Sequence, residues 1–195
     1  TANASHQLRT PLAGLRVSLE RGDLAAASAE AERLSATVDH LLAFARDALP
    51  AAAAIDVGPV LAAAAQRWQE TFRDTRRSLT ATIGPTLPDI RVRPASLDQI
   101  LDVLLDNSLR HGDGETRIVA RSTHGGLVIQ IDDDGPGIAP TQVPLVFTRH
   151  EGSSTGIGLA LARTLVEADG GRLLLSDPEH AEFRVVFAAP PLLSR

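Results

Sequence analysis

A helix pattern followed at once by two strand patterns, within residues 97–133, constrains the fold of this chain more than any other stretch. In LDQILDVLLDNSLRH the apolar residues recur at helical spacing, so one stripe of the helix is expected to be buried. The segments at about 116–122 and 127–132 alternate between apolar and polar residues, as half-buried strands do. Together they predict a helix layer packed on a sheet. The predicted stripe consists of Leu97, Ile100, Leu101, Leu104 and Ser108.

The segments on either side of this stretch complete a mixed α and β domain. Gly170-Gly171 follows the last helix pattern and is a typical helix stop, because glycine readily adopts the left-handed conformation of a C-cap. Residues 57–195 are therefore predicted to form an α+β two-layer sandwich. Its further expected elements are helices at 61–72 and 156–169 and strands at 79–83, 172–176 and 183–187.

Residues 1–49 have a different pattern, that of two short amphipathic helices joined by a turn. The turn is expected at Arg21-Gly22-Asp23, with Asp23 capping the second helix. Such a hairpin cannot bury both apolar stripes alone, so we expect it to form half of a dimeric four-helix bundle with a second copy of the chain. Residues 50–56 are expected to be a linker. The first stripe consists of Leu8, Leu12, Leu15 and Leu19, and the second runs from Leu34 to Leu49.

The composition excludes several classes of function. The net charge of −5 argues against a nucleic-acid-binding surface. The absence of cysteine excludes disulfides and thiolate metal sites. The chain contains no apolar run long enough to span a membrane, and we expect no signal peptide. Because it also lacks methionine, even at position 1, we expect it to be part of a longer protein.

The segment LVIQIDDDGPGI, residues 127–138, contains the first candidate site. Alternation places Asp133 on the same face as the apolar residues of its strand, where an unpaired carboxylate is costly. The exocyclic amine of a purine is one possible partner, and Gly135 and Gly137 would let a ligand or another backbone come close. The alternative is a simple exit from the strand into a turn with solvated carboxylates.

A second candidate site lies on the predicted helix, where Val103, Asn107, Arg110 and His111 share a face. An amide oxygen such as that of Asn107 can ligate Mg²⁺, which takes its remaining ligands from water and phosphates. Arg110 could supply positive charge to the same phosphates. The alternative is a solvated polar face.

Two further stretches contain polar residues at predicted helix starts. Gly156 and Gly158 open a helix whose free N–H groups favour an anion, although a lone Gly-x-Gly is weak evidence. The polar segment 148–155 before it has the makings of a mobile lid. His6, in SHQLRTPL, precedes the first helix pattern and, taken alone, is typical of a surface histidine.

The order of these segments along the chain is more specific than any one of them. SHQLRTPL is similar to a phospho-acceptor box, LLDNSLRHG to an N box, DDDGPGI to a G1 box, VFTRH to an F box and STGIGLAL to a G2 box. With all five in family order, the chain resembles a sensor histidine kinase of bacterial two-component systems. The resemblance implies that residues 57–195 have the ATPase fold shared with DNA gyrase and mismatch-repair ATPases.

The resemblance also implies roles for individual residues. His6 would accept the phosphoryl group of ATP, with Gln7 and Thr10 as its catalytic neighbours. Asp133 would bind the adenine amine, and Asn107 would hold the Mg²⁺ ion. Phe147 would anchor the lid. The implied nucleotide-binding residues are Asn107, Arg110, His111, Asp133, Gly135, Gly137, Phe147, Arg149, Gly156, Gly158 and Leu159.

The implied partner is the receiver domain of a response regulator, which would take the phosphoryl group on an aspartate. Thr10 matches a position that the family uses to remove phosphate from that regulator. The resemblance implies a longer membrane sensor with this part on the cytoplasmic side of the cell membrane. Gln7 stands where many members have an acidic residue, and Val103 replaces a common Asn, so an alternative is an ATP-binding signalling module with weak kinase activity.

Overall fold

The computed structural model describes residues 16–19, 21–24, 26–27, 52–148 and 155–189. The chain divides into two compact units. One comprises residues 1–50 and 150–157, and the other comprises residues 51–149 and 158–195.

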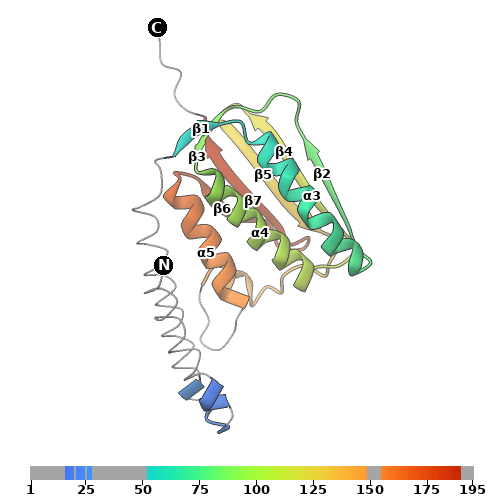
Figure 1. Ribbon diagram of the computed structural model, residues 1–195, viewed down its shortest axis with the longest axis vertical. Helices are drawn as coiled ribbons and strands as arrows, with labels where there is room; N and C mark the ends of the chain where they lie inside the picture. The colour runs from blue at the N-terminus through green and yellow to red at the C-terminus, as the bar shows by residue number, and fades with distance from the viewer. Residues whose placement is uncertain (1–15, 20, 25, 28–51, 149–154, 190–195) are drawn as a thin grey trace. The chain divides into compact units, whose positions relative to one another are not determined.

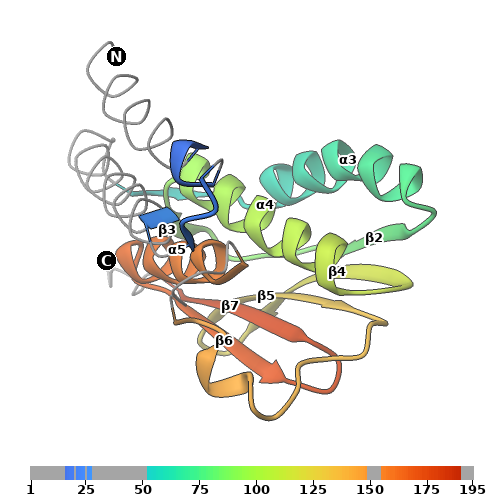
Figure 2. The same cartoon turned by 90° about the horizontal axis from the view of Figure 1, so that it is seen from below.

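The second unit consists of a sheet with helices on one face (Figures 1 and 2). The five strands of this sheet lie in the order β2-β4-β5-β7-β6. The result is the two-layer sandwich predicted from the sequence. The strands are β2 (Ser78–Ile83), β4 (Glu115–Thr123), β5 (Gly126–Asp133), β6 (Arg172–Asp177) and β7 (Glu182–Ala188), and the helices are α3 (Gly58–Asp74), α4 (Pro94–His111) and α5 (Thr155–Ala168).

The core lies between the helices and the sheet. The expected stripe of α4 is confirmed, since Leu97, Ile100, Leu101 and Leu104 are each at most 1% exposed and Ser108 is 3% exposed. Strand β5 contributes Leu127, Ile129 and Ile131 from alternate positions, each likewise at most 1% exposed. The helical and strand periodicities of the sequence therefore meet in one apolar layer.

Pairing in the sheet is mixed. Strands β4 and β5 form a hairpin, and so do β6 and β7, whereas β2 pairs parallel to β4. A parallel pair needs a crossover connection, and here β3 (Ile90–Val92) and α4 supply it. Helix α5 ends at Ala168, just before the expected stop at Gly170, which has a φ of +78°, and the N–H of Gly171 donates to the carbonyl of Val166.

Three short elements were not expected, β3 among them. The sequence places residues 53–55 in a linker, but Ala53–Ile55 form strand β1, which pairs antiparallel with β3. The linker assignment of 50–56 is corrected to this extent. A short 3-10 helix, η1 (Val143–Leu145), lies between β5 and α5.

Of the first unit, the structure describes the region around the predicted turn. Gly22 has a φ of +69°, and the N–H of Ala26 donates to the Asp23 carboxylate at 2.9 Å. Asp23 thus caps the following helical segment as expected. The rest of the predicted hairpin lies outside the described residues. Within the part of the chain that the structure describes, no helix is long and apolar enough to cross a bilayer.

Candidate nucleotide-binding site

Three consecutive carboxylates at the end of β5 have different surroundings. Asp132 and Asp134 both bind the guanidinium of Arg117, at 2.6 and 2.7 Å. Hydrogen bonds from Arg117 and from the Glu115 N–H lower the pKa of the Asp134 carboxyl. Asp133 faces the core and is 3% exposed, as the alternation predicts. Asp133 is therefore the carboxylate of the three that is not neutralised by Arg117.

Asp133 is held by two hydrogen bonds. The Oγ of Ser108, on α4, donates to Oδ2 at 2.8 Å, and the backbone N–H of Gly135 donates to Oδ1 at 2.8 Å. An ionised carboxylate has about four acceptor positions, so these two donors leave others unfilled. The group is thus oriented and can accept a hydrogen bond from a ligand, for example from an amine.

Two glycines lie directly against this carboxylate. A Cβ atom at Gly112 would lie 2.3 Å from Oδ2 of Asp133, and one at Gly135 would lie 2.6 Å from Oδ1. Neither position can hold a side chain without moving Asp133. Gly135 was expected from the sequence to permit such an approach, whereas Gly112 was not identified.

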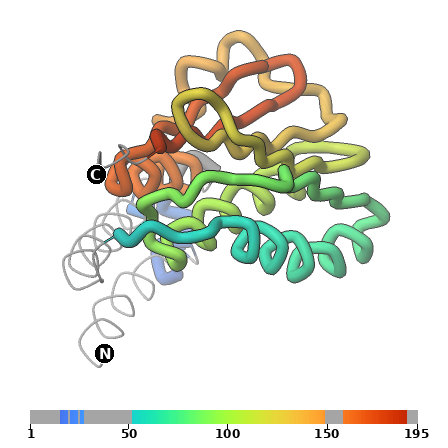
Figure 3. Tube along the Cα trace, turned by 90° about the horizontal axis from the view of Figure 1, so that it is seen from above, coloured from blue at the N-terminus to red at the C-terminus, as the bar shows by residue number. Residues whose placement is uncertain are grey.

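The turn after β5 packs against the β6–β7 turn, as Figure 3 shows. Gly137 has a φ of +74°, and a Cβ there would lie 2.3 Å from the carbonyl oxygen of Glu179. The N–H of Ile138 donates to the carbonyl of Pro178 at 2.7 Å. Glycine is needed at position 137 both for its conformation and for this contact.

Within the β6–β7 turn, His180 and Asp177 form an exposed ion pair, with Nδ1 of His180 2.8 Å from Oδ2 of Asp177. Asp177 raises the pKa of His180 above 6.5, and His180 lowers the pKa of Asp177 below 3.8. The histidine's contribution to stability is complete below pH 6.5 and is lost as the pH rises through its folded-state pKa. The aspartate's contribution is present above pH 3.8 and is lost as the pH falls through its folded-state pKa.

We therefore expect His180→Gln to lower the free energy of unfolding more at pH 5.5 than at pH 8.5. Urea unfolding of both proteins at the two pH values measures the difference. His124→Gln, at an exposed histidine in the β4–β5 turn, is the matched control. A loss of stability equal at both pH values would contradict the ion-pair explanation.

The polar face of α4 lies near the start of α5. Asn107 and Val103 are half-buried, and a Cβ at Gly158 would lie 3.4 Å from Cγ1 of Val103. Gly158 therefore lies beside the face of α4 that carries Asn107. Leu159, which follows, is 7% exposed and belongs to the core.

The two basic candidates on α4 are exposed. Arg110 donates from Nε to Oδ2 of Asp106 at 2.7 Å, one turn back on the same helix. His111 is the last residue of α4. The structure thus places both at the C-terminal end of the helix, with the Arg110 guanidinium already paired to a carboxylate.

Phe147 is half-buried and directly precedes, in the sequence, the segment expected to form the lid. Its ring meets Phe183 edge-on, with centroids 6.1 Å apart, and the guanidinium carbon of Arg163 lies 5.4 Å from the Phe147 centroid. A cation over an aromatic face is attractive. These contacts hold Phe147, the residue before the expected lid segment, against α5 and β7.

Several predicted site residues lie outside the described residues, namely His6, Gln7, Thr10 and Arg149. Gly156 is described only as part of the first turn of α5. The structure brings Asp133 and Gly135 together with the C-terminal end of α4.

Besides Gly112, the sequence did not identify as site residues three polar residues in the cluster around Asp133. Thr116 on β4 is fully buried and lies opposite Asp133 in the strand register. Its Oγ1 is 2.8 Å from Oγ of Ser108, which was expected only as part of the buried stripe. Arg77 donates to Thr116 at 3.1 Å. A threonine among the apolar residues of a strand is the one sequence signal that points to this cluster.

The donor set suits Mg²⁺ held mainly by a ligand. Among the described residues there is no group of three or more His, Asp or Glu side chains able to form a metal cage. Mg²⁺ commonly takes one or two protein oxygens and completes its shell with phosphates and water. The half-buried amide of Asn107 fits that role.

Comparison with known proteins decides the family. The family described as histidine kinase-, DNA gyrase B-, and HSP90-like ATPase matches residues 92–193, a region that contains α4, Asp133 and α5. The chain belongs to this ATPase family. The matched region is thus an ATP-binding domain of the family.

Curated proteins similar to the chain include sensor proteins. The chain is 32% identical over 201 residues to a probable sensor histidine kinase of Mycobacterium tuberculosis, covering 96% of this chain and 52% of that protein. It is 30% identical over 195 residues to the alginate biosynthesis sensor protein KinB of Pseudomonas aeruginosa, covering 87% of this chain and 33% of that protein. The chain is thus a member of the bacterial two-component sensor histidine kinases. It spans between a third and about half the length of these relatives.

A solved structure agrees with this family assignment. The ATP-binding domain of PrrB from Mycobacterium tuberculosis superposes with a TM-score of 0.60 at 26% identity, covering 71% of this chain and 98% of that domain. The α/β sandwich is therefore the fold of histidine kinase ATP-binding domains.

Proposed function

We propose that this chain is an ATP-dependent protein-histidine kinase that phosphorylates itself on His6 and passes the phosphoryl group to an aspartate of a response regulator. The observation that carries the proposal is Asp133, a buried carboxylate held by Ser108 and Gly135 with acceptor positions to spare. An acceptor-only group of this kind suits the amine of adenine. The family match and the SHQLRTPL segment support the same conclusion.

The remaining residues would position the nucleotide. Asn107 would hold Mg²⁺ against the phosphates, and the ion would neutralise charge during transfer. Backbone N–H groups at Gly156 and Gly158 would face the phosphate chain, since a helix N-terminus favours an anion. Phe147 would anchor the lid, and Arg110 and Arg149 would add positive charge. His111 and Leu159 would complete the nucleotide-binding surroundings.

At the acceptor, a ring nitrogen of His6 would attack the γ-phosphorus of ATP while the bond from that phosphorus to ADP breaks. A neutral imidazole is a competent nucleophile near neutral pH, and the other ring nitrogen then sheds its proton. Gln7 is not a base, so water would take this proton. General-base help is typically worth about 10²- to 10⁴-fold, so we propose a slow reaction.

Incubation with Mg-ATP labelled in the γ-phosphate tests the kinase function. We expect protein-bound phosphate that is labile in acid and stable in base, the behaviour of a phosphohistidine. The label should be absent in His6→Ala and retained in His124→Ala, which removes an exposed histidine of the β4–β5 turn. Equal labelling of His6→Ala and the wild type would exclude His6 as the acceptor.

A second candidate function is a signalling module that binds ATP but has weak kinase activity, acting mainly as a response-regulator phosphatase or a scaffold. Gln7 and Val103 favour it, and Thr10 would take part in removing phosphate. Tight ATP binding without labelling in the same experiment would support this alternative.

The proposed setting is the one that the resemblance to sensor histidine kinases implies. Two copies would pair through the helical hairpin of residues 1–49 as a four-helix bundle, and the response regulator would dock near His6. The full-length protein would be a membrane sensor with this part on the cytoplasmic side of the membrane. Nucleic acid is not a proposed partner, given the net charge of −5.

A further inference from the structure

Arg77, the last residue before β2 in the segment between α3 and β2, binds the C-terminal end of α4. Its guanidinium donates to the carbonyl of Ser108 at 2.6 Å, and its centre lies 5.4 Å from the ring centroid of the buried Phe72. A positive charge at the end of a helix is favourable, because the last carbonyls are unpaired. The other backbone acceptors, at 3.0–3.2 Å, are the carbonyls of Leu109, Gly112, Asp113 and Gly114.

Besides these five carbonyls, Arg77 has a sixth acceptor, the hydroxyl of Thr116. This contact begins a series of hydrogen bonds with a defined direction. Nη2 of Arg77 donates to Oγ1 of Thr116 at 3.1 Å. Ser108 has one hydroxyl proton, which it gives to Asp133, so in its 2.8 Å contact with Thr116 it must accept. The order is therefore Arg77 to Thr116, Thr116 to Ser108, and Ser108 to Asp133.

We propose that Arg77 is a positioning residue for nucleotide selection: through Thr116 and Ser108 it fixes the orientation of Asp133, and so sets the preference of the site for a purine with an exocyclic amine. The inference rests on the proposed nucleotide-binding function. The hydroxyl proton of Thr116 is donated to Ser108, and that of Ser108 is donated to Asp133. Oδ2 of Asp133 therefore always receives a hydrogen bond, and the carboxylate keeps its remaining acceptor positions for the ligand.

The test measures a preference and not an affinity alone. Calorimetry with the full chain in Mg²⁺ compares ATP with purine riboside triphosphate, which lacks the 6-amino group. General damage to the domain would weaken the binding of both nucleotides alike. A misoriented Asp133 would weaken the binding of ATP more than that of the analogue. We expect the wild type to prefer ATP by roughly 10- to 100-fold, as is typical of a hydrogen bond to a charged group.

We expect Ser108→Ala to reduce this preference about tenfold and Thr116→Val about threefold, because the first removes a donor to the charged group and the second a neutral donor. Arg77→Met should reduce it at least as much as Thr116→Val. If Arg77→Met fails to fold, Thr116→Val still decides, because the carbonyl contacts of Arg77 stay in place. Thr116→Ser keeps the hydroxyl and, unlike Thr116→Val, should keep the wild-type preference for ATP.

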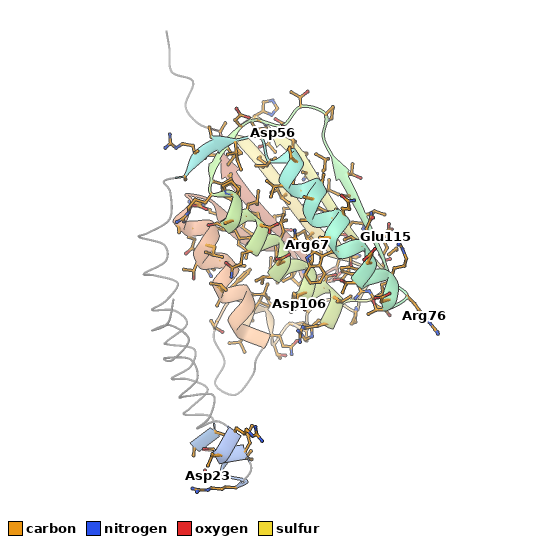
Figure 4. All side chains as sticks on the ribbon, in the orientation of Figure 1. Asp23, Asp56, Arg67, Arg76, Asp106 and Glu115 are labelled. Atoms are coloured by element: carbon orange, nitrogen blue, oxygen red, sulfur yellow. The ribbon has the colours of Figure 1, made fainter. Side chains whose placement is uncertain are left out.

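The matched control is Arg76→Met. Arg76 precedes Arg77, is exposed, and projects outward at the α3–β2 corner in Figure 4. The Arg76→Met substitution removes the same charge from the same corner and should leave the preference for ATP unchanged. Because the bonds act in series, Thr116→Val combined with Ser108→Ala should be no worse than Ser108→Ala alone.

Two results would overturn the inference, and they are distinguishable. If the wild type binds ATP selectively but Ser108→Ala and Thr116→Val keep the same preference, the chain of hydrogen bonds has only a structural role. If the folded wild type binds neither nucleotide, the proposed function fails, and this inference fails with it.

Discussion

Gly112→Ala is expected to weaken ATP binding by about 100-fold while leaving the domain folded. The new Cβ would lie 2.3 Å from Oδ2 and 2.4 Å from Oδ1 of Asp133, so the carboxylate must turn away from its position. Gly112 has a φ of −86°, which alanine adopts without strain. A misplacement of about 1 Å in a binding group can cost on the order of 10² in activity, and we expect a comparable loss of affinity here.

Calorimetry with Mg-ATP measures this loss. Gly125→Ala is the matched control, because a Cβ at Gly125 meets nothing within 4 Å. Circular dichroism should show both variants folded. Wild-type affinity in Gly112→Ala would mean that Asp133 does not bind the nucleotide.

Asp169→Ala is expected to lower the free energy of unfolding by about 3–5 kcal/mol, the typical cost of removing one partner of a buried ion pair. Asp169 follows α5, and Oδ1 accepts from Nε and Nη2 of Arg93, both at 2.8 Å, just before α4 begins. The side chains are 1% and 11% exposed. The substitution would leave a largely buried guanidinium without its carboxylate.

Urea unfolding followed by the fluorescence of Trp68, the one tryptophan of the chain, measures this change. Glu167→Ala is the control. It removes the exposed carboxylate that binds Arg163 at 2.9 Å, and such pairs contribute roughly 0–1 kcal/mol. Replacing both partners, as in Arg93→Met with Asp169→Leu, should recover much of the lost stability. A loss below about 1 kcal/mol in Asp169→Ala would contradict a large contribution of this ion pair to stability.

The sequence predicts the elements whose periodicity is long and regular. The stripe of α4 and the alternation of β5 are enough to place Asp133 on the core face, because side-chain direction follows from the helical and strand repeats. Strands β1 and β3 escape prediction because each has three residues. So short a segment carries no readable alternation, and its pairing depends on a partner about 40 positions away.

The same distinction applies to the candidate site. Asp133, Asn107 and Gly135 lie in segments with a local pattern. Arg77 and Thr116 act through contacts between residues 39 positions apart, and nothing in the neighbouring sequence of either residue specifies that contact. In the sequence Gly112 is typical of a helix stop, an interpretation that makes no reference to Asp133. Its second role becomes visible only when β5 is placed beside α4.

The β1–β3 ladder has a mechanical consequence. Ala53 pairs with Val92, so the chain enters β1 at the same end of the ladder from which β3 continues toward α4. Tension between the preceding segment and α4 would peel the pairs apart one at a time, starting with Ala53 and Val92, instead of shearing all of them together. A small pulling force on the chain ahead of β1 would thus act first beside Arg93, the residue before the helix that carries Asn107.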